Sequence, residues 1–151
     1  MATPDQFSAI LGDWNGLSRL WLDPCKDPFE CTKSTTARKI INDQSLELNY
    51  LWSLEGENQS GKLIITFSDD GKANASWLDS WHMAHQMMHL EGSFTESDVT
   101  LLGGYAAPPG PDWGWSIKIE LNDSSQWTFK MFNITPDGES SLAVQADFKQ
   151  G

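Results

Sequence analysis

The residues best suited to chemistry lie between Asp79 and His89, where the three histidines of the chain are found, at positions 82, 85 and 89. On a helix these imidazoles would share one face and could bind zinc or copper. On a hairpin, His85 and His89 share a face, and His82 lies opposite them across the turn. Since no capping signal precedes the stretch, we favour the hairpin, with histidines in the turn, and we expect no metal site.

Asp79 and Arg38 are the charged residues most suited to an interior position. Asp79 lies between Trp77 and Trp81, so it is either an interior polar anchor or a cap at the end of a turn. Arg38 either covers outer apolar surface with its stem or points inward, toward Asp79 or a ligand carboxylate. Asp79 could also form an acid–base pair with His82 or His89, provided that apolar surroundings tune either group.

The elements that must position these residues alternate like β-strands. Lys72 to His82 follows an Asp70-Gly71 turn, and both of its faces mix apolar with polar residues, as in the wall of a partly polar barrel. One short amphipathic helix is expected from Pro4 to Leu11, where Thr3 and Gln6 would form a capping box.

Ten alternating segments joined by tight connections predict an all-β fold: a ten-stranded antiparallel up-and-down barrel, calycin- or lipocalin-like, with a short N-terminal helix, in one domain over residues 1–151. A sandwich is the alternative, and the barrel is favoured because the strands are long and closure removes their edges. The clearest strand is 113–121, where every residue on the Trp115 face is apolar, so this face should line the lumen. By the same reasoning Leu48, Trp52, Trp127 and Phe129 should point inward.

Composition limits the classes of partner. The net charge of −11 disfavours nucleic acid and anionic membrane surfaces as partners. Residues 1–10 lack the features of a signal peptide, and no apolar span has the length of a membrane helix, so a cytoplasmic protein is expected. Cys25 and Cys31 should stay free thiols in a reducing cytosol, although their spacing also permits a disulfide or a metal site shared with histidines.

Several short motifs resemble a known superfamily. Gly12-Asp13-Trp14 after a helix resembles the Gly-x-Trp opening of calycins, which include lipocalins and fatty-acid-binding proteins. The segments 67–71, 75–81 and 90–94 are similar to an uncharacterised bacterial calycin-like family that is distantly related to nitrobindin-like haem proteins. The resemblance implies a barrel with a small-molecule cavity and supplies no known activity. Nitrobindin-like barrels bind haem through a His near the chain end, but residues 141–149 contain none, so we expect no haem and no other cofactor.

Three functions stay open. The first is binding of a small, largely apolar or amphipathic molecule in the lumen of a monomer or weak dimer. Aromatic walls and three polar groups would form this site: Trp21, Trp52, Trp81, Tyr105 and Trp115, with Arg38, Asp79 and His89. The second is an enzyme (a lyase, isomerase or hydrolase) that acts on a hydrophobic substrate with Asp79 and a histidine. Because the sequence carries no common catalytic motif, we favour binding. The third is a structural or interaction barrel with a filled core.

Overall fold

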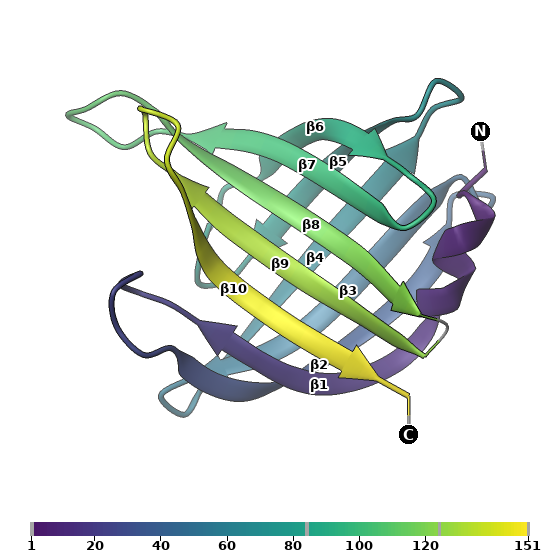
Figure 1. Ribbon diagram of the computed structural model, residues 1–151, viewed down its shortest axis with the longest axis horizontal. Coiled ribbons are helices and arrows are strands. Elements are labelled where there is room, and N and C mark those ends of the chain that lie inside the picture. Colours follow the sequence, from purple (N-terminus) through teal and green to yellow (C-terminus); the bar gives the residue numbers. More distant parts are fainter. Residues whose placement is uncertain (1, 84, 124, 151) are drawn as a thin grey trace.

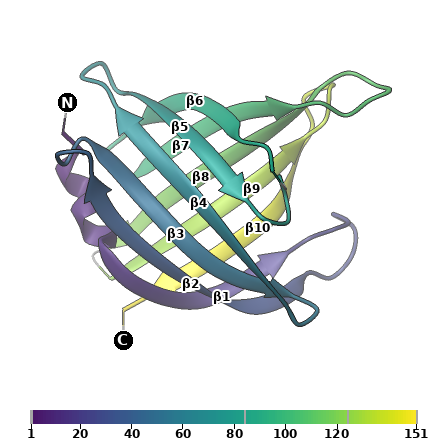
Figure 2. The ribbon, with the colours of Figure 1, turned by 180° about the vertical axis from the view of Figure 1, so that it is seen from behind.

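A computed structural model describes residues 2–83, 85–123 and 125–150, in which ten antiparallel strands form a closed barrel (Figures 1 and 2). Each strand pairs with its neighbours in sequence, and the last strand pairs with the first. The predicted fold class is therefore confirmed; of the expected domain 1–151, Met1, Ala84, Ser124 and Gly151 lie outside the described residues. The strands are β1 (Gly12–Leu20), β2 (Phe29–Ile40), β3 (Ser45–Leu54), β4 (Glu57–Phe67), β5 (Lys72–Asp79), β6 (Met88–Phe94), β7 (Asp98–Tyr105), β8 (Trp113–Asp123), β9 (Gln126–Ile134) and β10 (Ser140–Lys149).

The N-terminal helix η1 (Asp5–Ile10) is a 3-10 helix that covers one end of the barrel, which we call the closed end (Figure 1). Phe7 of η1 stacks on Phe67, with ring centroids 5.1 Å apart. The predicted capping box is wrong, because its groups connect the helix to neighbouring turns instead. The backbone N–H of Thr3 donates to the Asp43 carbonyl, and the Gln6 amide donates to the Thr95 carbonyl. In the described part of the chain, no helix is long and apolar enough to cross a membrane.

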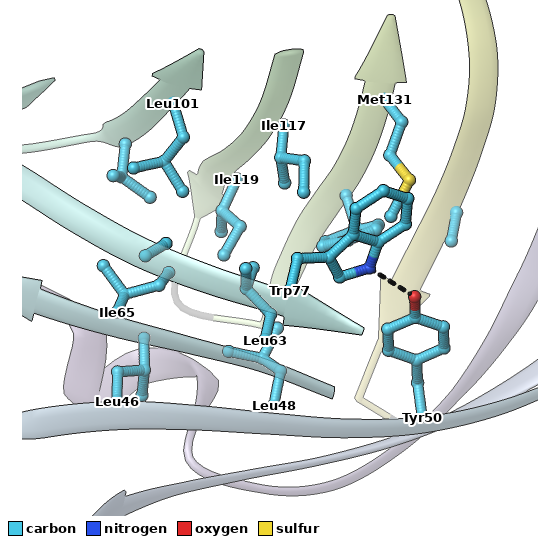
Figure 3. Packing of buried hydrophobic residues seen from close by; sticks show 14 of the residues in the cluster. Leu46, Leu48, Tyr50, Leu63, Ile65, Trp77, Leu101, Ile117, Ile119 and Met131 are labelled. Atoms are coloured by element: carbon cyan, nitrogen blue, oxygen red, sulfur yellow. Dashed lines mark hydrogen bonds between the residues drawn. The ribbon is translucent and has the colours of Figure 1, made fainter. Parts of the chain in front are cut away.

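Alternate residues of the strands point inward and fill the barrel at the closed end. Figure 3 shows how aliphatic side chains from facing strands meet there. The expected inward direction of the Trp115 face of β8 is confirmed, because Trp115, Ile117 and Ile119 are buried. The inward predictions for the other strands are confirmed by the burial of Leu48, Trp52, Trp127 and Phe129.

The opposite end, which we call the mouth, is formed by the connections after β1, β3, β5, β7 and β9. Both chain ends lie at the closed end (Figures 1 and 2). The mouth is therefore bordered by connections between strands alone, and its chemistry comes from strand ends and from the loops that follow them.

Candidate functional site

Asp79, the last residue of β5, anchors a buried polar site at the mouth. Its side chain is 2% exposed, and both carboxylate oxygens accept hydrogen bonds. Oδ2 accepts from the Tyr50 hydroxyl over 2.7 Å and from Trp52 Nε1 over 3.3 Å. Oδ1 accepts from the backbone N–H groups of Trp81 and His82 over 2.9 and 3.0 Å. Both alternatives for Asp79 are thus realised, because it is an interior anchor that also caps the turn after β5.

Gly61 makes the Tyr50–Asp79 contact possible. Gly61 of β4 pairs with Tyr50 of β3 on one side and with Asp79 of β5 on the other. A Cβ atom at Gly61 would lie 2.2 Å from the Tyr50 ring and hydroxyl, so only glycine lets the phenol cross β4. Trp77 Nε1 donates to the Tyr50 oxygen over 2.9 Å (Figure 3). Burial, together with the charge and hydrogen bond of Asp79, raises the pKa of Tyr50 well above its usual value, so the phenol stays a donor.

The interior cation of this site is Lys33 on β2, whose side chain is 3% exposed. Its Nζ lies 4.2 Å from the centroid of the Tyr50 ring and 4.3 Å from that of Phe129. These distances are typical of cation–π contacts. The positive charge that the sequence suggested for the lumen is therefore present, but another residue carries it.

Of the two positions considered for Arg38, the structure has the outer one, so its predicted place in the ligand site is wrong. In the β2–β3 hairpin, Ala37 pairs with Leu48 and takes the inward face, which leaves Arg38 opposite Glu47 on the outer face. The Arg38 side chain is 63% exposed, and its Nε lies 2.6 Å from Glu47 Oε1. Lys62 Nζ lies 3.3 Å from the other carboxylate oxygen, so Glu47 has two cationic neighbours outside the barrel.

His82 lies directly after this strand end and is surrounded by indoles. Its ring centroid lies 4.7 Å from Trp81, 5.3 Å from Trp115, 5.6 Å from Trp77 and 5.7 Å from Trp52. Burial lowers the pKa of His82 to about 4, against the raising effect of the Asp79 charge and with the lowering effect of Lys33. The imidazole is therefore neutral at neutral pH.

The expectation that His89 lines the lumen is wrong. His89 is exposed on the outer face of β6, where its Nε2 lies 3.7 Å from Glu91 Oε1. Its neighbours Met88 and Leu90 are buried and take the inward face, because the apolar residues of β6 lie on that parity. His85 is also exposed, so the three histidines do not converge. In the described residues, no three His, Cys, Asp or Glu side chains are grouped as a metal site requires.

Two hollows open at the mouth on either side of His82. The first, of about 260 Å³, is lined by Trp77, Met88 and Tyr105, and we call it the Met88 hollow. The second, of about 180 Å³, lies beside Trp21, and we call it the Trp21 hollow. Both hollows share three lining residues: Trp81, His82 and Trp115.

Trp115 supplies a free polar group in these shared walls. The indole is 7% exposed, yet its Nε1–H has no hydrogen-bond partner among the described residues. Tyr105 and Asn133, which line one hollow each, bond to each other over 2.6 Å. Because a buried donor without a partner costs free energy, an acceptor atom of a bound molecule would stabilise Trp115 in this position.

The structure brings together most of the predicted site residues: Trp21, Trp52, Asp79, Trp81, Tyr105 and Trp115. Sequence reasoning missed the roles of Lys33, Tyr50 and Gly61. Gly61 did carry a signal, since a glycine inside a strand often marks a close approach of another group. Cys25 and Cys31 are both free thiols, and Cys31 lies beside the space next to Lys33.

The family follows from the sequence over nearly its whole length. Residues 4–150 match the family model described as "Protein of unknown function (DUF1579)". The chain belongs to the DUF1579 family. No curated protein sequence matches it.

Solved structures of other proteins share the architecture. The structure is similar to that of Rv2717c from M. tuberculosis, at 12% identity and a TM-score of 0.66, with coverage of 100% of this chain and 99% of that one. It is also similar to the S-type phycobiliprotein lyase CPES from Guillardia theta, at 14% identity and a TM-score of 0.61, with coverage of 100% and 93%. At these identities the likeness shows the barrel fold alone.

Proposed function

We propose that this calycin-like barrel binds a small, flat, amphipathic molecule at its mouth, in the hollows around His82. The observation that carries the proposal is the Trp115 Nε1–H, a buried donor without a described partner in the wall that both hollows share. The ligand would supply the missing acceptor and would cover the surrounding indoles, since Trp81 is 39% exposed at the rim.

The volumes favour the mouth over the deep lumen. At the closed end, the space between the strands is occupied by buried aliphatic and aromatic side chains. The Met88 hollow, of about 260 Å³, is slightly smaller than common ligand pockets, which begin at roughly 300 Å³. The ligand of this proposal is therefore compact, of about two fused rings, and lies against Trp77, Trp81 and Trp115.

The site chemistry favours binding over acid–base catalysis. Hydrogen bonds already occupy both oxygens of Asp79, from Tyr50 and Trp52 and from two backbone groups. His82, with a pKa of about 4, is a weak base at neutral pH. An enzyme that used Asp79 and His82 would have to break this network first, so binding is the function that we propose.

Coumarin, a flat bicyclic lactone with a carbonyl acceptor, serves as the probe in a calorimetric titration. Trp115→Phe removes the N–H donor and keeps an aromatic ring, so we expect it to weaken binding about tenfold, the effect of one hydrogen bond. Trp127→Phe is the matched control, because Trp127 Nε1–H also lacks a described partner but lies at the closed end against Phe148. This control should bind coumarin like the wild type.

Native mass spectrometry of freshly purified protein tests the same proposal without a chosen probe. We expect a co-purified small molecule that is lost in Trp115→Phe and retained in Trp127→Phe. The proposal fails if coumarin shows no saturable binding and no molecule co-purifies. It also fails if the two variants reduce binding equally, because the effect would then come from the whole barrel.

A further inference from the structure

Lys33 is an interior lysine without an ion-pair partner among the described residues. Its side chain is 3% exposed, and its Nζ lies over the rings of Tyr50 and Phe129. A buried ammonium is usually paired with a carboxylate, but both oxygens of the nearby Asp79 accept hydrogen bonds from other donors. The amine is thus held inside an aromatic enclosure with its terminal nitrogen free of hydrogen bonds from the described chain.

We propose that Lys33 is a carbonyl-reactive amine that condenses with small aldehydes to form a Schiff base inside the barrel. This site goes beyond ligand binding in the hollows and does not depend on it. A desolvated lysine in apolar surroundings is a recognised way for a protein to activate an amine for attack on a carbonyl carbon.

Burial of Lys33 favours its neutral amine form. Burial lowers its pKa to about 8, although the charges of Asp79 and Cys31 act in the opposite direction. His82, which also lies near this amine, is neutral at neutral pH, and the raised pKa of Tyr50 keeps its phenol neutral. At pH 7 the neutral fraction of Lys33 is therefore on the order of a hundredfold larger than that of an ordinary lysine.

A small space gives access to this amine from the mouth. It has a volume of about 10 Å³ and touches Lys33, Cys31 and His82. Its walls include Leu20 at the end of β1 and Ser53 near the end of β3, both at the mouth. A space of this size holds about one water molecule, so the carbonyl compound must be small or must displace a neighbouring side chain.

The condensation is balanced without a further reactant. The lone pair of the neutral Lys33 amine attacks the carbonyl carbon, a C–N bond forms, and the C=O π electrons move to oxygen. A proton passes from nitrogen to that oxygen, which gives a carbinolamine. The remaining N–H proton then passes to the hydroxyl oxygen, the C–O bond breaks with loss of water, and the nitrogen lone pair forms the C=N bond. Amine and aldehyde thus yield imine and one water.

The test uses acetaldehyde with cyanoborohydride, whose hydride reduces the imine to a stable ethylamine. The folded protein is treated at pH 7, and peptide mapping by mass spectrometry measures the ethylation rate of each lysine. We expect Lys33 to react about tenfold faster than the exposed Lys26, because limited access reduces the gain in neutral amine. The Lys33 rate should also rise with pH and level off above about 8, the pKa of this amine.

Three controls separate this result from other causes. In urea, where the barrel is unfolded, the preference for Lys33 should disappear. Lys130, which is half-buried but paired with Glu120 at 2.6 Å, should react slowly in the folded protein. Trp127→Phe, at the closed end, should leave the Lys33 rate unchanged. Because Lys33 lines neither hollow, a slow reaction of Lys33 would not contradict the proposed ligand site. The proposal is overturned if Lys33 in the folded protein reacts no faster than Lys26.

Discussion

The interior of this barrel is packed differently at its two ends. At the closed end, Trp127 stacks on Phe148 with centroids 4.4 Å apart, and Phe7 of η1 covers the strands. At the mouth, Trp115 stacks on Trp77 at 5.6 Å, but its other surroundings are the hollows. Apolar contacts thus stabilise one end, and a hydrogen-bonded network around Asp79 organises the other. The difference separates the tightly packed end of the barrel from the end at which we propose ligand binding.

The largest expected effect compares the two indoles. Trp127→Ala should reduce the free energy of unfolding by about 3–5 kcal/mol, because it leaves a cavity in a packed region. Trp115→Ala should cost less, about 1–3 kcal/mol, because open space already borders this side chain and solvent can enter. Urea denaturation of both variants measures the difference. Equal losses would show that the two ends are packed alike.

A second comparison tests how the network at the mouth is built. Gly61→Ala should destabilise the protein by about 1–3 kcal/mol, because the new methyl group overlaps the Tyr50 ring and displaces its hydroxyl from Asp79. Gly104→Ala on β7 is the matched control, since its nearest contact would be the Trp113 carbonyl oxygen at 3.3 Å. Thermal unfolding of both variants is the measurement. If Gly61→Ala is as stable as Gly104→Ala, the Tyr50–Asp79 contact does not depend on a glycine at position 61.

The smallest effect concerns pH and belongs to the mouth alone. His82 has a folded pKa of about 4 and an ordinary value of 6.5, so between these pH values the unfolded chain binds the proton more readily. Its contribution to stability is complete above pH 6.5 and is lost as the pH falls toward 4, with a loss of about 1–2 kcal/mol between pH 7 and pH 5.

Urea unfolding at pH 7 and at pH 5 measures the contribution of His82 to the free energy of unfolding. The proteins compared are the wild type, His82→Gln and His89→Gln. The decrease in the free energy of unfolding from pH 7 to pH 5 should be smaller in His82→Gln than in the wild type. His89→Gln, which changes an exposed imidazole, should retain the wild-type loss. A His82→Gln protein with the full pH dependence would show that the buried imidazole does not cause it.

Sequence patterns predicted the strands whose two faces differ clearly. On β8, one face is apolar and the other carries Lys118 and Glu120, so its register has one reasonable solution. On β2 both faces mix polar with small residues, and alternation alone could not choose between Arg38 and Lys33. The β2–β3 pairing decides which face of β2 is inward. Leu48 on the apolar inward face of β3 lies opposite Ala37, so the face of Ala37 and Lys33 points inward.

The candidate site was less predictable because it depends on contacts between strands that are distant in sequence. Asp79 could be identified as an interior candidate from its flanking tryptophans. Its partner Tyr50 could not, because the contact crosses β4 and depends on the missing side chain of Gly61. Likewise, which of His82 and His89 lies at the mouth site depends on the residue at which β6 begins. That residue is Met88.

The seam between β1 and β10 has a consequence for the mechanical strength of the barrel. The pair Gly16–Phe148 lies nearest to both chain ends, and the paired residues then continue toward the mouth as far as Leu20–Val144. A force that pulls the two termini apart therefore acts on one pair of residues at a time, because the hydrogen bonds of an antiparallel ladder run perpendicular to the strands. In an optical trap the barrel should open at this seam at low force, by successive rupture of single pairs and not by collective sliding of the strands.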